Sequence, residues 1–262
     1  MDRVKEEEQL NNNQPSFFDL LLEAHISLKR QGPGSANSMR QALGFLEPLD
    51  RIEQTADLGC GTGGQTMLLA EYLPGTIVGL DMFPEFIEKL NQTVKTSGLE
   101  NRVKGIVGKM EDLPFQENSL DLIWSEGAID NIGFREGLDH WHGFLKKDGY
   151  VAVTCPSWIT KEHPDVVEQF WSDAGSHLDS VEKNINIMQD CGFEFIAAFV
   201  LPEECWTENY YDPREKEIQR LIEKYDSCDS VKEYAELNQQ EVELFLAYKQ
   251  YYGYVFYIGR AI

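Results

Sequence analysis

Short apolar runs alternate with longer segments of helical spacing through the middle of the chain. The apolar runs have the length and composition of strands, and they occupy residues 51–58, 76–80, 103–107, 120–124, 150–154 and 192–196. The segments between them repeat apolar residues along one helix face, and they occupy residues 63–72, 84–96, 134–145 and 180–189. Strands that alternate with helices in this way form βαβ units. The pattern therefore predicts an α/β fold whose doubly wound, mostly parallel sheet is covered by helices on both faces.

Two segments interrupt this alternation. Residues 16–28 have helical spacing, a Gly-Pro-Gly breaker follows, and Ser35 is placed to cap a second helix that ends near Phe45. Residues 202–249 read as helical and carry 13 acidic against 6 basic residues, and an aromatic strand at 251–258 ends the chain. We therefore predict four parts: a leader with a helical cap (1–50), a core (51–201), an acidic helical insertion (202–249) and a last core strand (250–262).

The charge of the chain limits its partners. The formal net charge is −22, with 23 basic and 45 acidic residues. Binding to nucleic acid or to an anionic membrane surface requires clustered positive charge, and the sequence has no basic run. We therefore expect a small-molecule ligand, no nucleic acid and no membrane partner, and we include a homodimer among the expected assemblies.

The N-terminal residues and the cysteines bear on the cellular location of the protein and on metal binding. Residues 1–15 are charged and polar, so we expect no signal peptide. The five cysteines are scattered without a C-x-x-C pair, which favours reduced thiols in a cytoplasmic protein over disulfides. No metal site is expected, because the sequence lacks clustered Cys and His residues.

The strongest chemical signal is the glycine run in A-D-L-G-C-G-T-G-G-Q-T, residues 56–66. Gly59, Gly61 and Gly64 have the G-x-G-x-x-G spacing of a loop that lets a nucleotide approach the start of a helix. Asp57 precedes this loop, and its charge would repel a bound pyrophosphate. S-adenosylmethionine (SAM) has no phosphate and carries an ammonium and a sulfonium, so SAM suits this loop better than a dinucleotide does.

Further candidates for the nucleoside follow the next two strands. Asp81 ends the second strand, where a carboxylate can accept hydrogen bonds from both ribose hydroxyls. After the third strand, Glu111 can bind the adenine amino group, and Met82 and Met110 can sandwich the ring.

Together these residues resemble the class I SAM-dependent methyltransferases. The resemblance rests on D-L-G-C-G-T-G, V-G-L-D, M-E-D-L-P-F and L-D-L-I-W-S-E-G, within residues 52–155. Within that family, these residues are most similar to the small-molecule branch that includes the ubiquinone/menaquinone-biosynthesis methyltransferases. The resemblance implies a Rossmann-like core with seven strands, the last antiparallel, and SAM as cofactor. Lys109 departs from the family pattern, which leaves Glu111 and the backbone of Met110 as the expected adenine partners.

The acceptor side is less defined. Glu126 and Asp130 follow the fourth strand, where each could orient the acceptor or take its proton, or could only cap a helix. A solvated histidine is the simpler explanation of His142, although it could act as a base. Trp158, Trp206, Tyr210 and Tyr211 could line an acceptor pocket or pack in the core.

The sequence thus predicts a SAM-dependent methyltransferase that acts on a small molecule. Two alternatives stay open. One is a SAM-binding protein without catalytic activity, which would keep the same glycine loop. The other is a dinucleotide-dependent oxidoreductase, which Asp57 disfavours.

Overall fold

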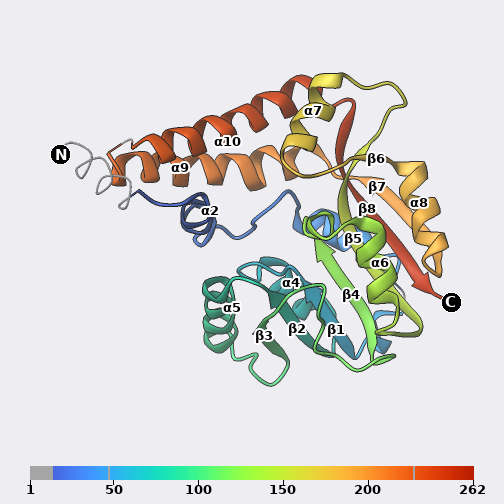
Figure 1. Ribbon diagram of the computed structural model, residues 1–262. Coiled ribbons are helices and arrows are strands. Elements are labelled where there is room, and N and C mark those ends of the chain that lie inside the picture. The colour runs from blue at the N-terminus through green and yellow to red at the C-terminus, as the bar shows by residue number, and fades with distance from the viewer. Residues whose placement is uncertain (1–13, 47, 227) are drawn as a thin grey trace, which may run out of the picture.

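The architecture is an α/β sheet with helices on both faces and a helical layer over one edge (Figure 1). The computed structural model describes residues 14–46, 48–226 and 228–262, so residues 1–13 of the predicted leader lie outside the described residues. The strands are β1 (Gln54–Leu58), β2 (Thr76–Asp81), β3 (Val103–Val107), β4 (Leu120–Glu126), β5 (Leu145–Trp158), β6 (Asp179–Ser180), β7 (Phe193–Val200) and β8 (Tyr252–Ala261).

The sheet confirms the predicted topology. Its order is β3-β2-β1-β4-β5-β8-β7. The first five of these strands pair in parallel, and β8 lies antiparallel to both β5 and β7. The strand order reverses between β1 and β4, so the carboxyl ends of these two strands border the crevice where open α/β sheets bind ligands.

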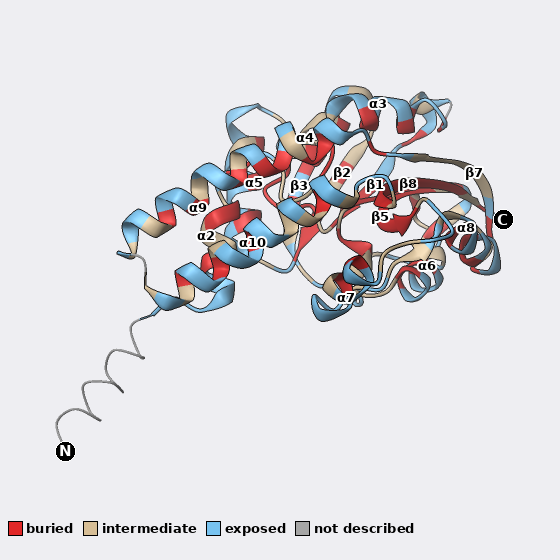
Figure 2. Cartoon of the chain, turned by 90° about the horizontal axis from the view of Figure 1, so that it is seen from above, coloured by how far each residue is buried: buried red, intermediate tan, exposed pale blue. Residues whose placement is uncertain are grey.

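Alternation along the strands separates the two faces of the core. In β5, Val151 and Val153 join one apolar cluster and Ala152 joins the other. The first cluster contains residues of α6 (Phe134–His142) and α8 (Val181–Asp190), and the second contains residues of α3 (Ala36–Leu43), α4 (Gly64–Tyr72) and α5 (Pro84–Thr96). Figure 2 shows the strands largely buried between these helices.

A layer of three helices lies over the carboxyl edge of the sheet (Figure 1). It consists of α2 (Phe17–His25), α9 (Asp212–Lys224) and α10 (Asp229–Tyr248), which we call the cap. Leu20 and Ala24 of α2 pack against Ile218 and Leu221 of α9 in an apolar cluster of their own. Ser35 caps α3 as predicted, because its side chain accepts a hydrogen bond from the first turn, and Ser16 caps α2 in the same way without having been predicted.

Three details differ from the sequence-based prediction. Asp179 and Ser180 pair with the end of β5, so a short strand joins the seven that were predicted. Helix α7 (Asp165–Asp173) was not predicted, although Val167 and Trp171 stand one helical turn apart and are buried. Strand β5 is longer than the predicted 150–154, because pairing with β8 extends as far as Trp158.

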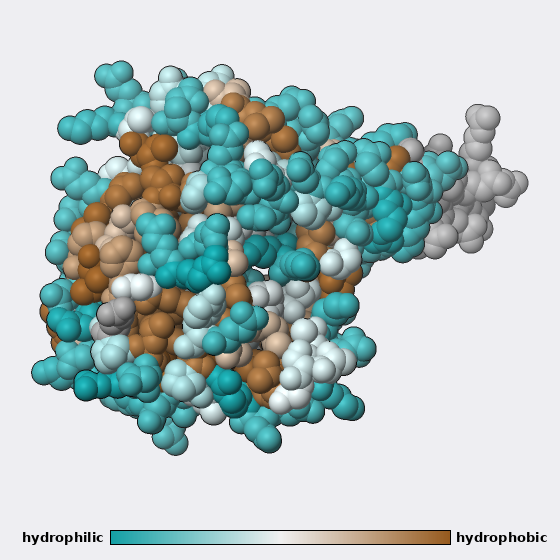
Figure 3. All heavy atoms as spheres, turned by 180° about the vertical axis from the view of Figure 1, so that it is seen from behind, coloured by the Kyte–Doolittle hydropathy of each residue, from teal (hydrophilic) through white to brown (hydrophobic). Residues whose placement is uncertain are grey.

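The outer surface is mostly hydrophilic. In the view from behind, apolar side chains gather on the side of the molecule away from the cap (Figure 3). Phe45 after α3 and Val200 at the end of β7 are among the exposed large apolar residues. Within the part of the chain that the structure describes, every helix is too short or too polar to cross a membrane.

Candidate active site

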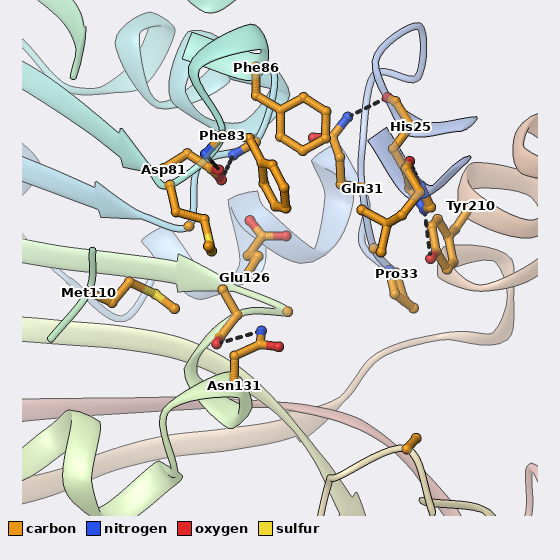
Figure 4. Close-up of a pocket in the computed structure, with 18 of the residues that line it drawn as sticks. His25, Gln31, Pro33, Asp81, Phe83, Phe86, Met110, Glu126, Asn131 and Tyr210 are labelled. Atoms are coloured by element: carbon orange, nitrogen blue, oxygen red, sulfur yellow. Dashed lines mark hydrogen bonds between the residues drawn. The ribbon is translucent and has the colours of Figure 1, made fainter. Parts of the chain in front are cut away.

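A cavity of about 570 Å³ lies between the carboxyl ends of the strands and the cap. Its lower wall is formed by the loops after β1, β2, β3 and β4, and its upper wall by α2, α9 and α10. Figure 4 shows side chains from both walls pointing into the same space. Seven of the ten predicted site residues line it: Gly59, Gly61, Asp81, Met82, Met110, Glu111 and Glu126.

The glycine loop requires glycines for two physical reasons. Gly59 and Gly61 have φ angles of +70° and +54°, which side chains rarely adopt. A Cβ on Gly59 would also lie 2.3 Å from the Cβ of Ala128. The amides of Gly59 and Cys60 both donate to Leu80 O, at 2.8 and 3.0 Å, which ties the loop to the end of β2. The loop therefore presents bare backbone to the cavity.

Asp81 links the loop to the start of α5. The Gly61 amide donates to Oδ2 of Asp81 at 2.9 Å, and the Phe83 amide donates to Oδ1 at 3.0 Å (Figure 4). Burial raises the pKa of Asp81, while these backbone bonds lower it. Each carboxylate oxygen keeps a second lone pair at the cavity wall, with which it can accept a hydrogen bond from a hydroxyl group.

Asp57 lies beneath the loop and does not line the cavity. Its side chain is fully buried, and Thr66 in α4 donates to Oδ2 at 2.6 Å. Oδ1 has no hydrogen-bond partner among the described residues. Burial raises the pKa of Asp57 to about 7, although the bond from Thr66 opposes that shift. The predicted contact between Asp57 and a ligand ammonium stays a prediction.

The wall after β2 and β3 is largely apolar, and it also carries Lys109 and Glu111. Met82 and Phe83 follow Asp81 and line the cavity, and Met110 lines it from the loop after β3; Phe83 and Met110 are labelled in Figure 4. The Met110 carbonyl accepts a hydrogen bond from Trp141 Nε1 at 3.0 Å, which fixes this loop against α6. Glu111 is exposed at the rim. An apolar slot with one acceptor fits a flat ring with an amino group.

Glu126 is held from both sides. Arg30 Nη1 donates to Oε2 at 2.7 Å, and Trp124 Nε1 donates to Oε1 at 2.9 Å. The Glu126 side chain is 1% exposed, so its ion pair with Arg30 is largely buried. Each of the two charges needs the other, because an unpaired buried charge is strongly destabilising. Sequence reasoning missed Arg30, since nothing in one sequence links positions 96 residues apart.

Two glutamines were also missed. Gln31 Nε2 donates to Leu28 O and to Thr62 Oγ1, both at 3.0 Å, while the Thr62 amide donates to its Oε1 at 3.0 Å. Gln31 thereby ties the segment after α2 to the glycine loop. Gln65 lines the cavity at the start of α4, and its buried Oε1 has no partner among the described residues. Such an acceptor fits a ligand ammonium.

The cap side of the cavity carries a polar cluster that the sequence did not reveal. Tyr210 Oη lies 3.2 Å from His25 Nε2 and accepts from Arg214 Nη1 at 2.9 Å. Arg214 also donates to Glu241 at 2.8 Å. Burial lowers the pKa of His25 to about 4, so its ring is neutral near pH 7. The only available signal was a basic residue inside an acidic helical segment.

The other candidates lie outside the cavity. Asp130 is turned toward Ser176, and His142 bonds to Gly192 O at 3.1 Å with its ring against Phe193. Of the four aromatic candidates, Tyr210 lines the cavity. Three pack in the core: Trp158, Trp206 and Tyr211.

Comparison with known proteins agrees with this geometry. Residues 56–153 match a protein family described as "Methyltransferase domain". A trans-aconitate 2-methyltransferase from Shigella dysenteriae is 27% identical over 172 residues, which is 63% of this chain and 62% of that protein. A ubiquinone/menaquinone biosynthesis C-methyltransferase from Citrifermentans bemidjiense is 34% identical over 100 residues, which is 37% of this chain and 43% of that protein. The match therefore spans less than two thirds of either relative.

The fold has similar solved structures. A SAM-dependent methyltransferase from Geobacter sulfurreducens, crystallised with S-adenosyl-L-homocysteine, superposes with a TM-score of 0.77 at 15% sequence identity. The superposition covers 93% of this chain and 98% of that one. The likeness thus extends over the cap as well as the sheet.

Proposed function

We propose that this chain is a class I SAM-dependent methyltransferase, which transfers the methyl group of SAM to a small-molecule acceptor bound beneath the cap. The observation that carries the proposal is one continuous cavity with two unlike ends. Bare glycine backbone and Asp81 border one end, and aromatic side chains of the cap border the other. A methyl donor and an acceptor would meet between them.

The residues present fit SAM. Gly59 and Gly61 allow the loop to turn with positive φ angles at the cavity wall, and Gln65 Oε1 offers an unused acceptor for the ammonium. Asp81 would bind the ribose hydroxyls. Met82 and Met110 would hold the adenine ring, with Glu111 at its amino group. Asp57 would support the ammonium by its charge from beneath the loop.

The chain itself needs to supply little beyond positioning. SAM supplies an activated methyl group on a sulfonium, so the main requirements are alignment with the nucleophile and exclusion of water. The cap helices would exclude water. Glu126 would orient the acceptor, since Arg30 and Trp124 hold both of its oxygens and fix its position. Asp130 and His142 have no role in this proposal.

Calorimetric titration with S-adenosyl-L-homocysteine, with NADH in parallel, tests the cofactor site. We expect S-adenosyl-L-homocysteine to bind and NADH not to bind. Asp81→Asn should weaken the affinity at least tenfold, because hydrogen bonds to a charged group contribute about 1.5–3 kcal/mol each.

The matched control is Glu88→Gln, which removes an exposed charge from α5 outside the cavity and should leave the affinity unchanged. Binding of NADH in place of S-adenosyl-L-homocysteine would contradict the proposal and favour a dinucleotide-dependent enzyme. Binding without turnover of any acceptor would favour a non-catalytic SAM-binding protein. The predicted homodimer and cytoplasmic location stay predictions.

A further inference from the structure

Arg214 is a buried cation with one unused end. It lines the cavity from α9 and is 3% exposed. Its Nη1 is occupied by Tyr210 and Glu241, and its guanidinium carbon lies 4.6 and 4.9 Å from the ring centres of Tyr210 and Tyr211. These contacts fix the plane of the guanidinium. Nη2 is buried and has no hydrogen-bond partner among the described residues.

A free guanidinium N–H in a buried site is unusual. Buried polar groups are nearly always hydrogen-bonded, and an unsatisfied charged donor is destabilising. The guanidinium group is planar and presents its donors in a fixed fork, which matches the two oxygens of a carboxylate. A rigid arginine on the cavity wall whose Nη2 is buried without a partner is therefore suited to an anionic oxygen ligand.

The surroundings of Nη2 define the rest of that ligand. The cap end of the cavity is lined mainly by large apolar and aromatic side chains: Phe17, Leu21, Phe170, Trp171, Tyr234 and Leu237. Such walls bind an apolar body, and a single polar group fixes its orientation. Asn238 lines the same end, and its amide already donates to Tyr234 O at 2.7 Å.

We infer that the methyl acceptor is a carboxylate with an apolar body, and that Arg214 Nη2 binds its carboxylate beneath the cap. This inference rests on the proposed function, because it assigns the acceptor end of the same cavity. Glu241 sets the strength of the contact. Its carboxylate shares the Arg214 guanidinium, so it weakens the attraction for a second anion while holding the fork in place.

Binding of small carboxylates to the protein saturated with S-adenosyl-L-homocysteine tests the inference. The probes are phenylacetate and hexanoate, each compared with its own amide by calorimetry. We expect each acid to bind at least tenfold more tightly than its amide. Arg214→Gln should reduce that preference to within twofold. Glu241→Gln, which keeps a hydrogen-bond acceptor but removes the competing charge, should tighten the acids at least threefold and leave the amides unchanged.

The matched control is Arg220→Gln, on the same helix but outside the cavity and 47% exposed, which should keep the full preference. Equal binding of acid and amide, no binding of any probe, or an unchanged preference in Arg214→Gln would overturn the inference. If Arg214→Gln fails to fold by circular dichroism, Glu241→Gln decides, and unchanged acid affinity there counts against it. Failure of S-adenosyl-L-homocysteine to bind, with the acid preference intact, would refute the proposed function but leave the anion site.

Discussion

Two acids at the ends of neighbouring strands differ in what surrounds them. Asp81 accepts two backbone amides and faces the cavity, whereas Asp57 is fully buried with one oxygen unpartnered. In the sequence the two residues look alike, since each is an acidic residue near the end of a predicted strand. Their environments separate them, because α4 covers Asp57 while the loop after β2 leaves Asp81 at the cavity wall.

Asp57 should make the free protein less stable as the pH rises. Its pKa is raised from 3.8 to about 7 in the fold, so the unfolded chain releases the proton first. The contribution of Asp57 to the free energy of unfolding is therefore fully present below pH 3.8 and is lost between pH 3.8 and about pH 7. The loss reaches about 4 kcal/mol at most, at 1.36 kcal/mol per pKa unit. Asp57→Asn should remove this loss, and urea unfolding at pH 5 and pH 8 measures it.

The matched control for that measurement is Asp112→Asn, an exposed acid in the loop after β3. It should leave the dependence on pH as it is in the native chain. A variant Asp57→Asn whose stability falls between pH 5 and pH 8 as much as that of the native chain would show that another group causes the change.

At the scale of elements, the segment after α2 lies directly on the start of α4. A Cβ on Gly64 would be 1.9 Å from the backbone oxygen of Lys29, although the Gly64 φ is helical and suits any residue. Gln31 reinforces this contact through Thr62. The segment between α2 and α3 is therefore packed on the glycine loop by close backbone approach.

Gly64→Ala should consequently separate the two segments. We expect the free energy of unfolding to fall by about 1–3 kcal/mol, as for overpacked sites, and the affinity for S-adenosyl-L-homocysteine to fall at least fivefold. Chemical unfolding and calorimetry measure these effects. Gly143→Ala is the control, since its φ is also helical and the nearest atom is 3.9 Å away. Equal effects of the two variants would show that crowding at Lys29 is not the cause.

Helices and strands with a regular spacing of apolar residues were predictable from the sequence, whereas contacts between distant segments were not. The glycine loop and Asp81 followed from local spacing, because strand, turn and helix are neighbours in sequence. The partner of Glu126 could not be found this way, since Arg30 lies 96 residues away in the sequence and meets it only in the tertiary fold. Likewise, nothing local shows that Arg214 faces the cavity rather than solvent. The sequence thus predicted the residues at the glycine-loop end of the cavity better than those at its cap end.

At the scale of the whole molecule, α10 packs into the core cluster near its C-terminal end. Trp206 and Phe245 belong to the core cluster, and their rings stack with centres 4.3 Å apart. Farther along α9 and α10, the apolar residues form a separate cluster with α2. Figure 1 shows these helices extending past the sheet. We propose that the far end of the cap loosens independently of the cofactor site, in keeping with the predicted division at residue 202.

Leu221→Ala tests this division. Leu221 is fully buried between α9 and α2, so its truncation should destabilise the cap by about 2–5 kcal/mol. Faster hydrogen exchange in residues 212–248 should follow, together with weaker binding of phenylacetate. The affinity for S-adenosyl-L-homocysteine should change less than threefold, since Gly59, Gly61 and Asp81 lie outside the cap. The control Leu246→Ala, 49% exposed on α10, should change neither the hydrogen exchange of the cap nor the binding of phenylacetate. Parallel loss of both ligands would instead mean that cap and core open as one cooperative unit.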